Sequence, residues 1–186
     1  MRKNKPTVVS IAAVAGGGKT TISREIGTRL ENSKVLYFDD YELDVGSGIE
    51  DICDWVDNGA DYSLWNLEPL VSRIKPLLSD EKLCLDYIIL DYPFAYKNKE
   101  IGQFIDYAVF IDTPLDVAMA RRIVRDYTGE TSDKIIADLK WYLLHGRKAY
   151  LEMLTSIKPN SDLVIDGSLP IGVIVDEIVA NIKKKN

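Results

Sequence analysis

Residues 10–21 read Ser10-Ile11-Ala12-Ala13-Val14-Ala15-Gly16-Gly17-Gly18-Lys19-Thr20-Thr21. Successive glycines let the backbone curl so that its N–H groups point at a phosphate, and a following helix adds its own free N–H groups and positive dipole end. In such a loop Lys19 reaches the β- and γ-phosphates, and the Thr20 hydroxyl binds Mg²⁺. The stretch therefore matches the phosphate-binding P-loop, G-x-x-x-x-G-K-[ST], with Ala13 where the first glycine is usual.

The residues on either side of the loop support this interpretation. Thr7–Ala13 is a β-branched, apolar run, and Ile22, Ile26 and Leu30 recur at helical spacing after it. The alternative is a turn that only joins a strand to a helix. That alternative does not explain why the turn has the sequence Gly-Gly-Gly-Lys-Thr-Thr. We predict that the residues binding the nucleotide phosphates are Ala15, Gly16, Gly17, Gly18, Lys19, Thr20 and Thr21.

The composition fits one globular domain with a proper core. The 186 residues are 46% hydrophobic and 28% charged, and no window approaches twenty uninterrupted apolar residues, so we expect no membrane span. The net charge of −6 argues against non-specific binding to nucleic acid, which needs a positive field. Cys53 and Cys84 are too few for a disulfide framework or a metal site. We therefore expect a protein of a reducing compartment, the cytoplasm.

Five apolar runs alternate with helical patterns and predict an α/β fold. Within their cores the runs do not alternate polar and apolar residues, which is typical of parallel strands covered by helices on both faces. Ligands of such sheets bind beyond the carboxyl ends of the strands. We predict a three-layer α/β/α sandwich whose five strands cover Thr7–Ala13, Lys34–Phe38, Tyr87–Asp91, Tyr107–Asp112 and Asp162–Asp166.

Capping residues and prolines mark the predicted helices between these strands. Asn66 is expected to cap the helix that begins at Leu67, and Thr113 to cap the helix that begins at Pro114. The predicted helices cover residues 20–31, 67–78, 114–126, 132–156 and 168–183.

Carboxylates at two strand ends are candidates for the chemistry. Asp39 and Asp40 follow the second run, where a carboxylate could orient an acceptor hydroxyl and accept its proton. Asp39 is the stronger candidate and a solvated turn is the alternative. Asp91 ends the third run, and we expect it to hold Mg²⁺ through a water next to Thr20, unless it only caps a turn.

Three arginines cluster after the fourth run. Arg121 and Arg125 share a helix face, and Arg122 points about a quarter turn away. Arginines so placed stabilise the charge that develops on a phosphoryl group in transfer. The residues up to Ser132 would then form a short lid. The alternative is an exposed basic helix face that pairs with nearby aspartates.

The window from Val35 through Ser72 has no Lys or Arg but is rich in carboxylates and aromatic residues. A phosphorylated acceptor normally needs a basic residue to hold its phosphate. The window therefore favours a neutral or cationic acceptor, with a ring stacked on an aromatic side chain. An acidic, solvated cover segment anchored by Trp55 and Trp65 is the alternative.

Taken together, these residues resemble the uridine kinase-like branch of the P-loop kinases, which is also related to phosphoribulokinase and pantothenate kinase. The resemblance implies an ATP-dependent reaction and five parallel strands with the P-loop strand in the middle. It places the family's base on Asp39 and its arginine-rich lid residues on Arg121, Arg122 and Arg125. The matching stretches are Ala15–Thr21, Asp39–Tyr41, the Asp91 strand, Ala120–Asp126 and Ser161–Gly167.

The sequence thus predicts a small-molecule kinase with one domain over residues 1–186, an acceptor-site insertion at about 40–66 and a lid at about 121–132. ATP and Mg²⁺ are the expected cofactors, and the acceptor is nucleoside-like or otherwise uncharged. A nucleotide-dependent switch ATPase acting on a protein partner and a nucleoside monophosphate kinase are the alternatives. We expect neither nucleic acid nor a membrane as a partner. The sequence leaves open whether the protein forms a homo-oligomer. The predicted catalytic residues are Lys19, Asp39, Arg121 and Arg125, Arg122 joins the nucleotide site, and Thr20 and Asp91 bind the metal.

Overall fold

The computed structural model describes residues 5–41 and 51–185, and it contains the predicted parallel sheet. Its strand order is β2-β3-β1-β4-β5, and every pair of neighbours is parallel. The strand that leads into the P-loop, β1, is therefore central, as the resemblance implied. The bounds agree with the predicted strands to within one residue: β1 (Thr7–Ala13), β2 (Ser33–Tyr37), β3 (Tyr87–Asp91), β4 (Tyr107–Asp112) and β5 (Leu163–Asp166).

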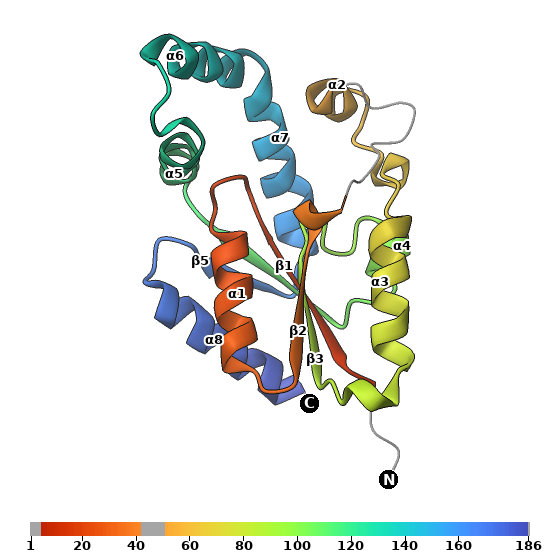
Figure 1. The fold of residues 1–186 in the computed structure, drawn as a ribbon. Helices are drawn as coiled ribbons and strands as arrows, with labels where there is room; N and C mark the ends of the chain where they lie inside the picture. The colour runs from red at the N-terminus through yellow and green to blue at the C-terminus, as the bar shows by residue number, and fades with distance from the viewer. Residues whose placement is uncertain (1–4, 42–50, 186) are drawn as a thin grey trace.

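Helices cover both faces of the sheet (Figure 1). On one face lie α1 (Lys19–Arg29) and α8 (Ile171–Lys185), and on the other lie α3 (Glu68–Ser79) and α4 (Lys99–Gly102). Beyond the carboxyl ends of the strands are α2 (Ile52–Asp57), α5 (Leu115–Tyr127), α6 (Ser132–Trp141) and α7 (Arg147–Glu152). The predicted α/β/α sandwich is confirmed.

Neighbouring residues of β1 point into opposite cores, which explains why the strand does not alternate polar and apolar residues. Val8 and Ala12 belong to the core on the α3 side, whereas Val9 and Ile11 pack with α1 and α8. All four side chains are fully buried. Because a strand turns successive side chains to opposite faces, a strand with helices on both sides has to be apolar throughout.

Two features of the helices differ from the predictions. Thr113 does not cap α5; it is buried, and its Oγ1 donates a hydrogen bond to the Gly17 carbonyl oxygen at 2.8 Å. The predicted helix over 132–156 contains two π-helical segments, η4 (Tyr142–Gly146) and η5 (Met153–Ile157). A Cβ on Gly146 would lie 2.4 Å from the Trp141 ring, so glycine permits this packing where the helix widens.

Short 3₁₀ segments complete the described chain, and two of them lie near the carboxyl ends of the strands. These two are η1 (Phe38–Asp40) and η2 (Tyr62–Leu64); the others are η3 (Glu81–Leu83) and η6 (Lys158–Asn160). Cys53 is buried, Cys84 is exposed, and both are free thiols. None of the described helices has the length and apolar character that crossing a membrane would require.

Asn98 ties η2 to the rest of the fold. Its side chain is 1% exposed, and its Nδ2 donates to the Tyr62 carbonyl oxygen at 2.9 Å. Its Oδ1 accepts from the backbone N–H groups of Glu100 and Ile101 at the start of α4, at 2.9 and 3.3 Å. One buried amide thus satisfies three backbone groups from two segments.

We expect Asn98→Ala to lower the free energy of unfolding by about 2–3 kcal/mol, because it leaves the Tyr62 carbonyl and the first N–H groups of α4 without partners. Urea denaturation measures the loss. Asn66→Ala is the matched control: Asn66 is exposed and is not the N-cap of α3, which is Leu67, but its Oδ1 accepts from the Glu68 N–H at 3.2 Å, so its loss should stay below about 1 kcal/mol. Equal losses in the two variants would contradict this account.

Candidate active site

The glycines of the P-loop allow it to pack tightly against α5. Gly16 and Gly18 have φ values of 78° and 97°, a region that favours glycine. A Cβ on Gly16 would lie 2.1 Å from the Ala118 carbonyl oxygen, so no larger residue fits there. Gly18 is the N-cap of α1, which begins at Lys19. The free N–H groups of this helix end therefore face the same side as the loop.

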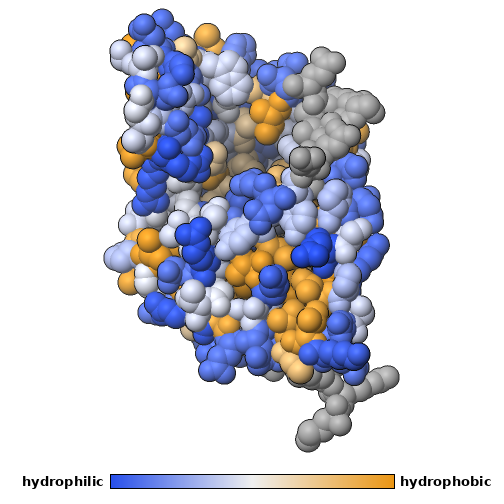
Figure 2. All heavy atoms as spheres, in the orientation of Figure 1, coloured by the Kyte–Doolittle hydropathy of each residue, from blue (hydrophilic) through white to orange (hydrophobic). Residues whose placement is uncertain are grey.

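A cavity of about 820 Å³ opens beyond the carboxyl ends of the strands, a size typical of small-molecule sites. Figure 2 shows it as a hollow in the upper part of the molecule, with pale and orange side chains in its depth. Predicted phosphate-binding and catalytic residues from three parts of the chain line it: Ala15, Gly16, Gly18, Lys19, Thr20 and Thr21 from the loop and α1, Asp39 from η1, and Arg121, Arg122 and Arg125 from α5. Two further predicted site residues, Gly17 and Asp91, are not among the residues that line it.

Asp91 forms an ion pair with Lys19. The carboxylate is 1% exposed and the Lys19 side chain 15% exposed. Strand β3 is the direct neighbour of β1, with Asp91 opposite Ile11, and this pairing brings the carboxylate under the P-loop. In this structure the partner of Asp91 is the loop lysine, and the expected role of Asp91 at a metal site next to Thr20 stays a prediction.

Asp39 reaches the cavity although β2 is not adjacent to β1. Strand β3 lies between them, and η1, which follows β2, carries Asp39 to the cavity wall. Asp40 is not among the residues that line the cavity. Neither aspartate forms an ion pair with a residue of the described chain. Of the two, Asp39 is the one placed to meet a bound acceptor.

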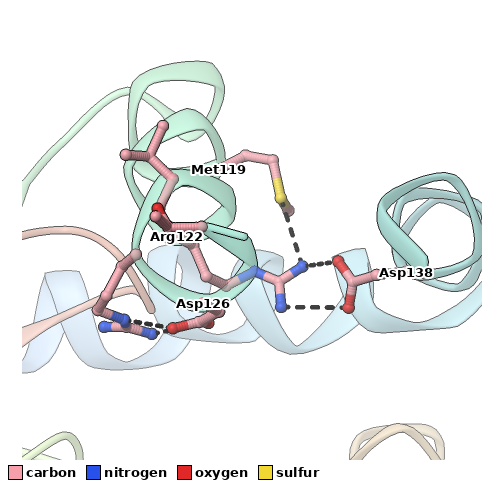
Figure 3. A network of polar contacts seen from close by, with 7 residues as sticks. Met119, Arg122, Asp126 and Asp138 are labelled. Carbon is pink, nitrogen blue, oxygen red and sulfur yellow. Dashed lines mark hydrogen bonds and ion pairs between the residues drawn. The ribbon is translucent and has the colours of Figure 1, made fainter. Parts of the chain in front are cut away.

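The three arginines have different partners (Figure 3). Arg122 points from α5 to α6, where it pairs with Asp138 and also contacts the Met119 sulfur at 3.5 Å. Burial opposes its charge, but the bond to Asp138 raises the pKa of Arg122 above its usual value. Arg125 binds Asp126 through two hydrogen bonds of 2.5 and 3.0 Å. The Arg125–Asp126 pair agrees with the alternative interpretation of the sequence, an exposed basic helix face that pairs with nearby aspartates.

Arg121 differs from its two neighbours because it contacts a backbone carbonyl. Its NH1 lies 3.5 Å from the Gly167 oxygen, in the turn after β5. In the described chain Arg121 forms no ion pair, so its charge is the least compensated of the three.

Aromatic rings form the side of the cavity away from the P-loop. Trp55 meets Tyr62 edge-on with ring centroids 5.0 Å apart, and Trp65 lies 4.9 Å from Phe94. These rings come from the window that the sequence indicated as the acceptor region, and part of that window, residues 42–50, lies outside the described residues. Beside them, where the Tyr62 hydroxyl donates to Glu152, the α6–α7 segment adds residues that sequence reasoning missed: Trp141, Tyr142, Tyr150, Glu152 and Met153.

Nearly the whole chain resembles curated uridine kinases. It is 26% identical to that of Clostridium tetani (strain Massachusetts / E88), across 97% of this chain and 96% of the relative. It is 28% identical to that of Clostridium botulinum (strain Langeland / NCTC 10281 / Type F), across 96% and 97%. No family model matches it.

Solved structures give the same fold at lower identity. A deoxyadenosine kinase from M. mycoides superposes with a TM-score of 0.54 and 16% identity, across 97% of this chain and all of that chain. A putative fructose transport system kinase from Silicibacter sp. TM1040 gives 0.55 and 15%, across 88% and 91%. The predicted P-loop kinase fold is confirmed. The uridine kinase relatives bear out the predicted enzyme class, an ATP-dependent phosphotransferase that acts on a hydroxyl group.

Removing the Lys19 charge should destabilise the fold, since it leaves the buried Asp91 carboxylate unpaired. We expect Lys19→Met to lower the free energy of unfolding by about 3 kcal/mol. Lys158→Met is the control, because Lys158 and Asp112 form a pair of 2.6 Å that is about one-third exposed, and its loss should be below about 1 kcal/mol. Urea denaturation of both variants measures the two losses of unfolding free energy. A loss for Lys19→Met no larger than that of the control would show that the buried pair stabilises the fold no more than the exposed pair does.

Proposed function

We propose that this protein transfers the γ-phosphoryl group of ATP to a hydroxyl of an uncharged, nucleoside-like acceptor. One observation carries the proposal: a single cavity joins the P-loop and the arginines of α5 to Asp39 and an aromatic wall. The first group of residues suits a nucleoside triphosphate, and the second suits a ring with hydroxyl groups. The relatives named above support the same class of reaction.

In this proposal the P-loop N–H groups and Lys19 bind the phosphates of ATP. The Thr20 hydroxyl would bind Mg²⁺, and Asp91 would hold the ion through a water, since oxygen ligands are those that Mg²⁺ prefers. When bound, the ion neutralises phosphate charge. The described residues contain no cluster of three or more metal-ligating side chains, which fits an ion held mainly by its nucleotide.

Asp39 orients the acceptor hydroxyl and accepts its proton as the oxygen attacks the γ-phosphorus. A new P–O bond forms to the acceptor, and the bond to the bridging oxygen of ADP breaks. Arg121 and Arg125 stabilise the negative charge on the transferring group, and Arg122 binds the nucleotide. Since Arg122 is paired with Asp138, its guanidinium is fixed in place before any phosphate arrives.

A nucleoside monophosphate acceptor fits the cavity less well. Such an acceptor needs a cation for its phosphate, and Lys97, Lys99 and Arg147 would have been the candidates. None of the three is among the residues that line the cavity. On the aromatic side, no Lys or Arg of the described chain takes part in the lining.

A coupled ADP-release assay tests the acceptor class directly. We expect Mg·ATP turnover with at least one member of a panel of nucleosides, sugars and vitamin alcohols, and no turnover with Lys19→Ala. Calorimetry with ATP shows whether binding survives in each case. Binding of ATP without turnover of any panel member would favour the protein-directed switch instead.

Asp39→Asn should lower kcat by about 10³-fold, because it removes the proton acceptor while leaving the volume of the side chain unchanged. The affinity for ATP should change by less than about twofold, since the P-loop is untouched. Asp40→Asn is the matched control and should retain a rate within about threefold of the unmodified protein. An unchanged rate in Asp39→Asn, or an equal loss in both variants, would exclude Asp39 as the base.

A further inference from the structure

Among the residues that the structure describes, Glu152 is the one charged residue on the aromatic side of the cavity. Among the described residues, that side is lined from α2, η2, residues 65, 93 and 94, and the segment 141–153. Every other lining residue there is apolar, aromatic or glycine, including Ile52, Trp55 and Met153. A carboxylate in such surroundings interacts more strongly with a ligand than one in open water, because the local dielectric is lower.

Tyr62 holds this carboxylate in a fixed position. The Tyr62 hydroxyl donates to Glu152 Oε1 at 2.9 Å, and Tyr62 is 8% exposed. Its ring packs edge-on against Trp55 and Phe94, and its backbone is bound by Asn98. Burial, together with the nearby carboxylate, raises the pKa of Tyr62, so its hydroxyl stays protonated and keeps donating at any physiological pH.

Glu152 has no cationic partner in the described chain. Of the four cations that line the phosphate end of the cavity in the described chain, three are compensated, Lys19 by Asp91, Arg122 by Asp138 and Arg125 by Asp126, and Arg121 contacts a backbone oxygen. Lys148 lies on the same helix as Glu152, but its ammonium group forms an ion pair with Asp57 at the end of α2. The Glu152 carboxylate accepts one hydrogen bond from Tyr62, and a carboxylate has room for further donors.

We propose that Glu152 determines acceptor specificity: it accepts a hydrogen bond from an N–H or O–H group of an uncharged acceptor and repels an acceptor that carries negative charge at that end. This inference rests on the proposed kinase function and names the residue that selects the acceptor class. Tyr62 is a positioning residue in this scheme. Discrimination arises because an anion placed against the half-buried Glu152 meets a like charge, whereas a neutral donor satisfies it.

The test uses two ring-substituted nucleosides of nearly equal shape, 5-carbamoyluridine and 5-carboxyuridine, which differ in one negative charge. We expect the unmodified protein to bind the carbamoyl compound at least tenfold more tightly, as measured by calorimetry. In Glu152→Gln this ratio should fall to about threefold or less. If ADP release is measured as well, the change should appear in KM, with kcat within about twofold.

Two further variants complete the experiment. Glu177→Gln changes the net charge equally but lies exposed on α8, outside the cavity, so the ratio should be unchanged. Tyr62→Phe keeps the Glu152 carboxylate but removes the hydroxyl that holds it in place. The ratio of the two affinities should then fall by about threefold. This variant also tests the inference if Glu152→Gln does not fold.

The inference is overturned if the ratio is the same in the unmodified protein and Glu152→Gln, or if neither nucleoside binds at millimolar concentration. The proposed function fails separately, if the acceptor panel yields no ADP that depends on Lys19. Binding with the expected ratio but without turnover would retain the specificity role of Glu152 and reject the kinase.

Discussion

The close contact between the P-loop and α5 sets the geometry of the whole site. Gly16 has no room for a side chain above the Ala118 carbonyl, and Thr113 fixes the Gly17 carbonyl from just before the same helix. Arg121, Arg122 and Arg125 follow Ala118 within two turns. Because the loop and the helix touch at backbone distance, the part of α5 that carries the arginines is fixed relative to the P-loop backbone. A larger residue at position 16 would separate the two halves of the phosphate site.

Charge in the site is balanced locally. Lys19, Arg122 and Arg125 each have a carboxylate partner, while Arg121 contacts only a backbone oxygen. Pairing of this kind reduces the repulsion among cations that line one cavity. It also keeps long side chains in one rotamer, which lowers the conformational entropy that phosphate binding would otherwise cost.

Local signals in the sequence were sufficient for the strands, the P-loop and the arginine cluster. Each depends on residues within about a dozen positions, such as the glycines before Lys19 or the apolar run up to Asp91. Thr113 was misread because its position next to Pro114 fits a cap, and only the tertiary contact with Gly17 shows otherwise. Asp138 and Glu152 were missed for a similar reason. Their partners, Arg122 and Tyr62, lie 16 and 90 positions away, and within a polar helix neither carboxylate stands out.

The ion pair beneath the P-loop has a thermodynamic consequence. In the proposed complex, a phosphate that binds Lys19 would compete with Asp91 for the ammonium group, and the carboxylate would then be more available to a divalent cation. Nucleotide and cation would therefore not bind independently: each would strengthen the affinity for the other by the same factor, as reciprocal linkage requires. The Lys19–Asp91 pair thus acts as a shared competitor of both ligands, and the two would enter the site as a cooperative unit.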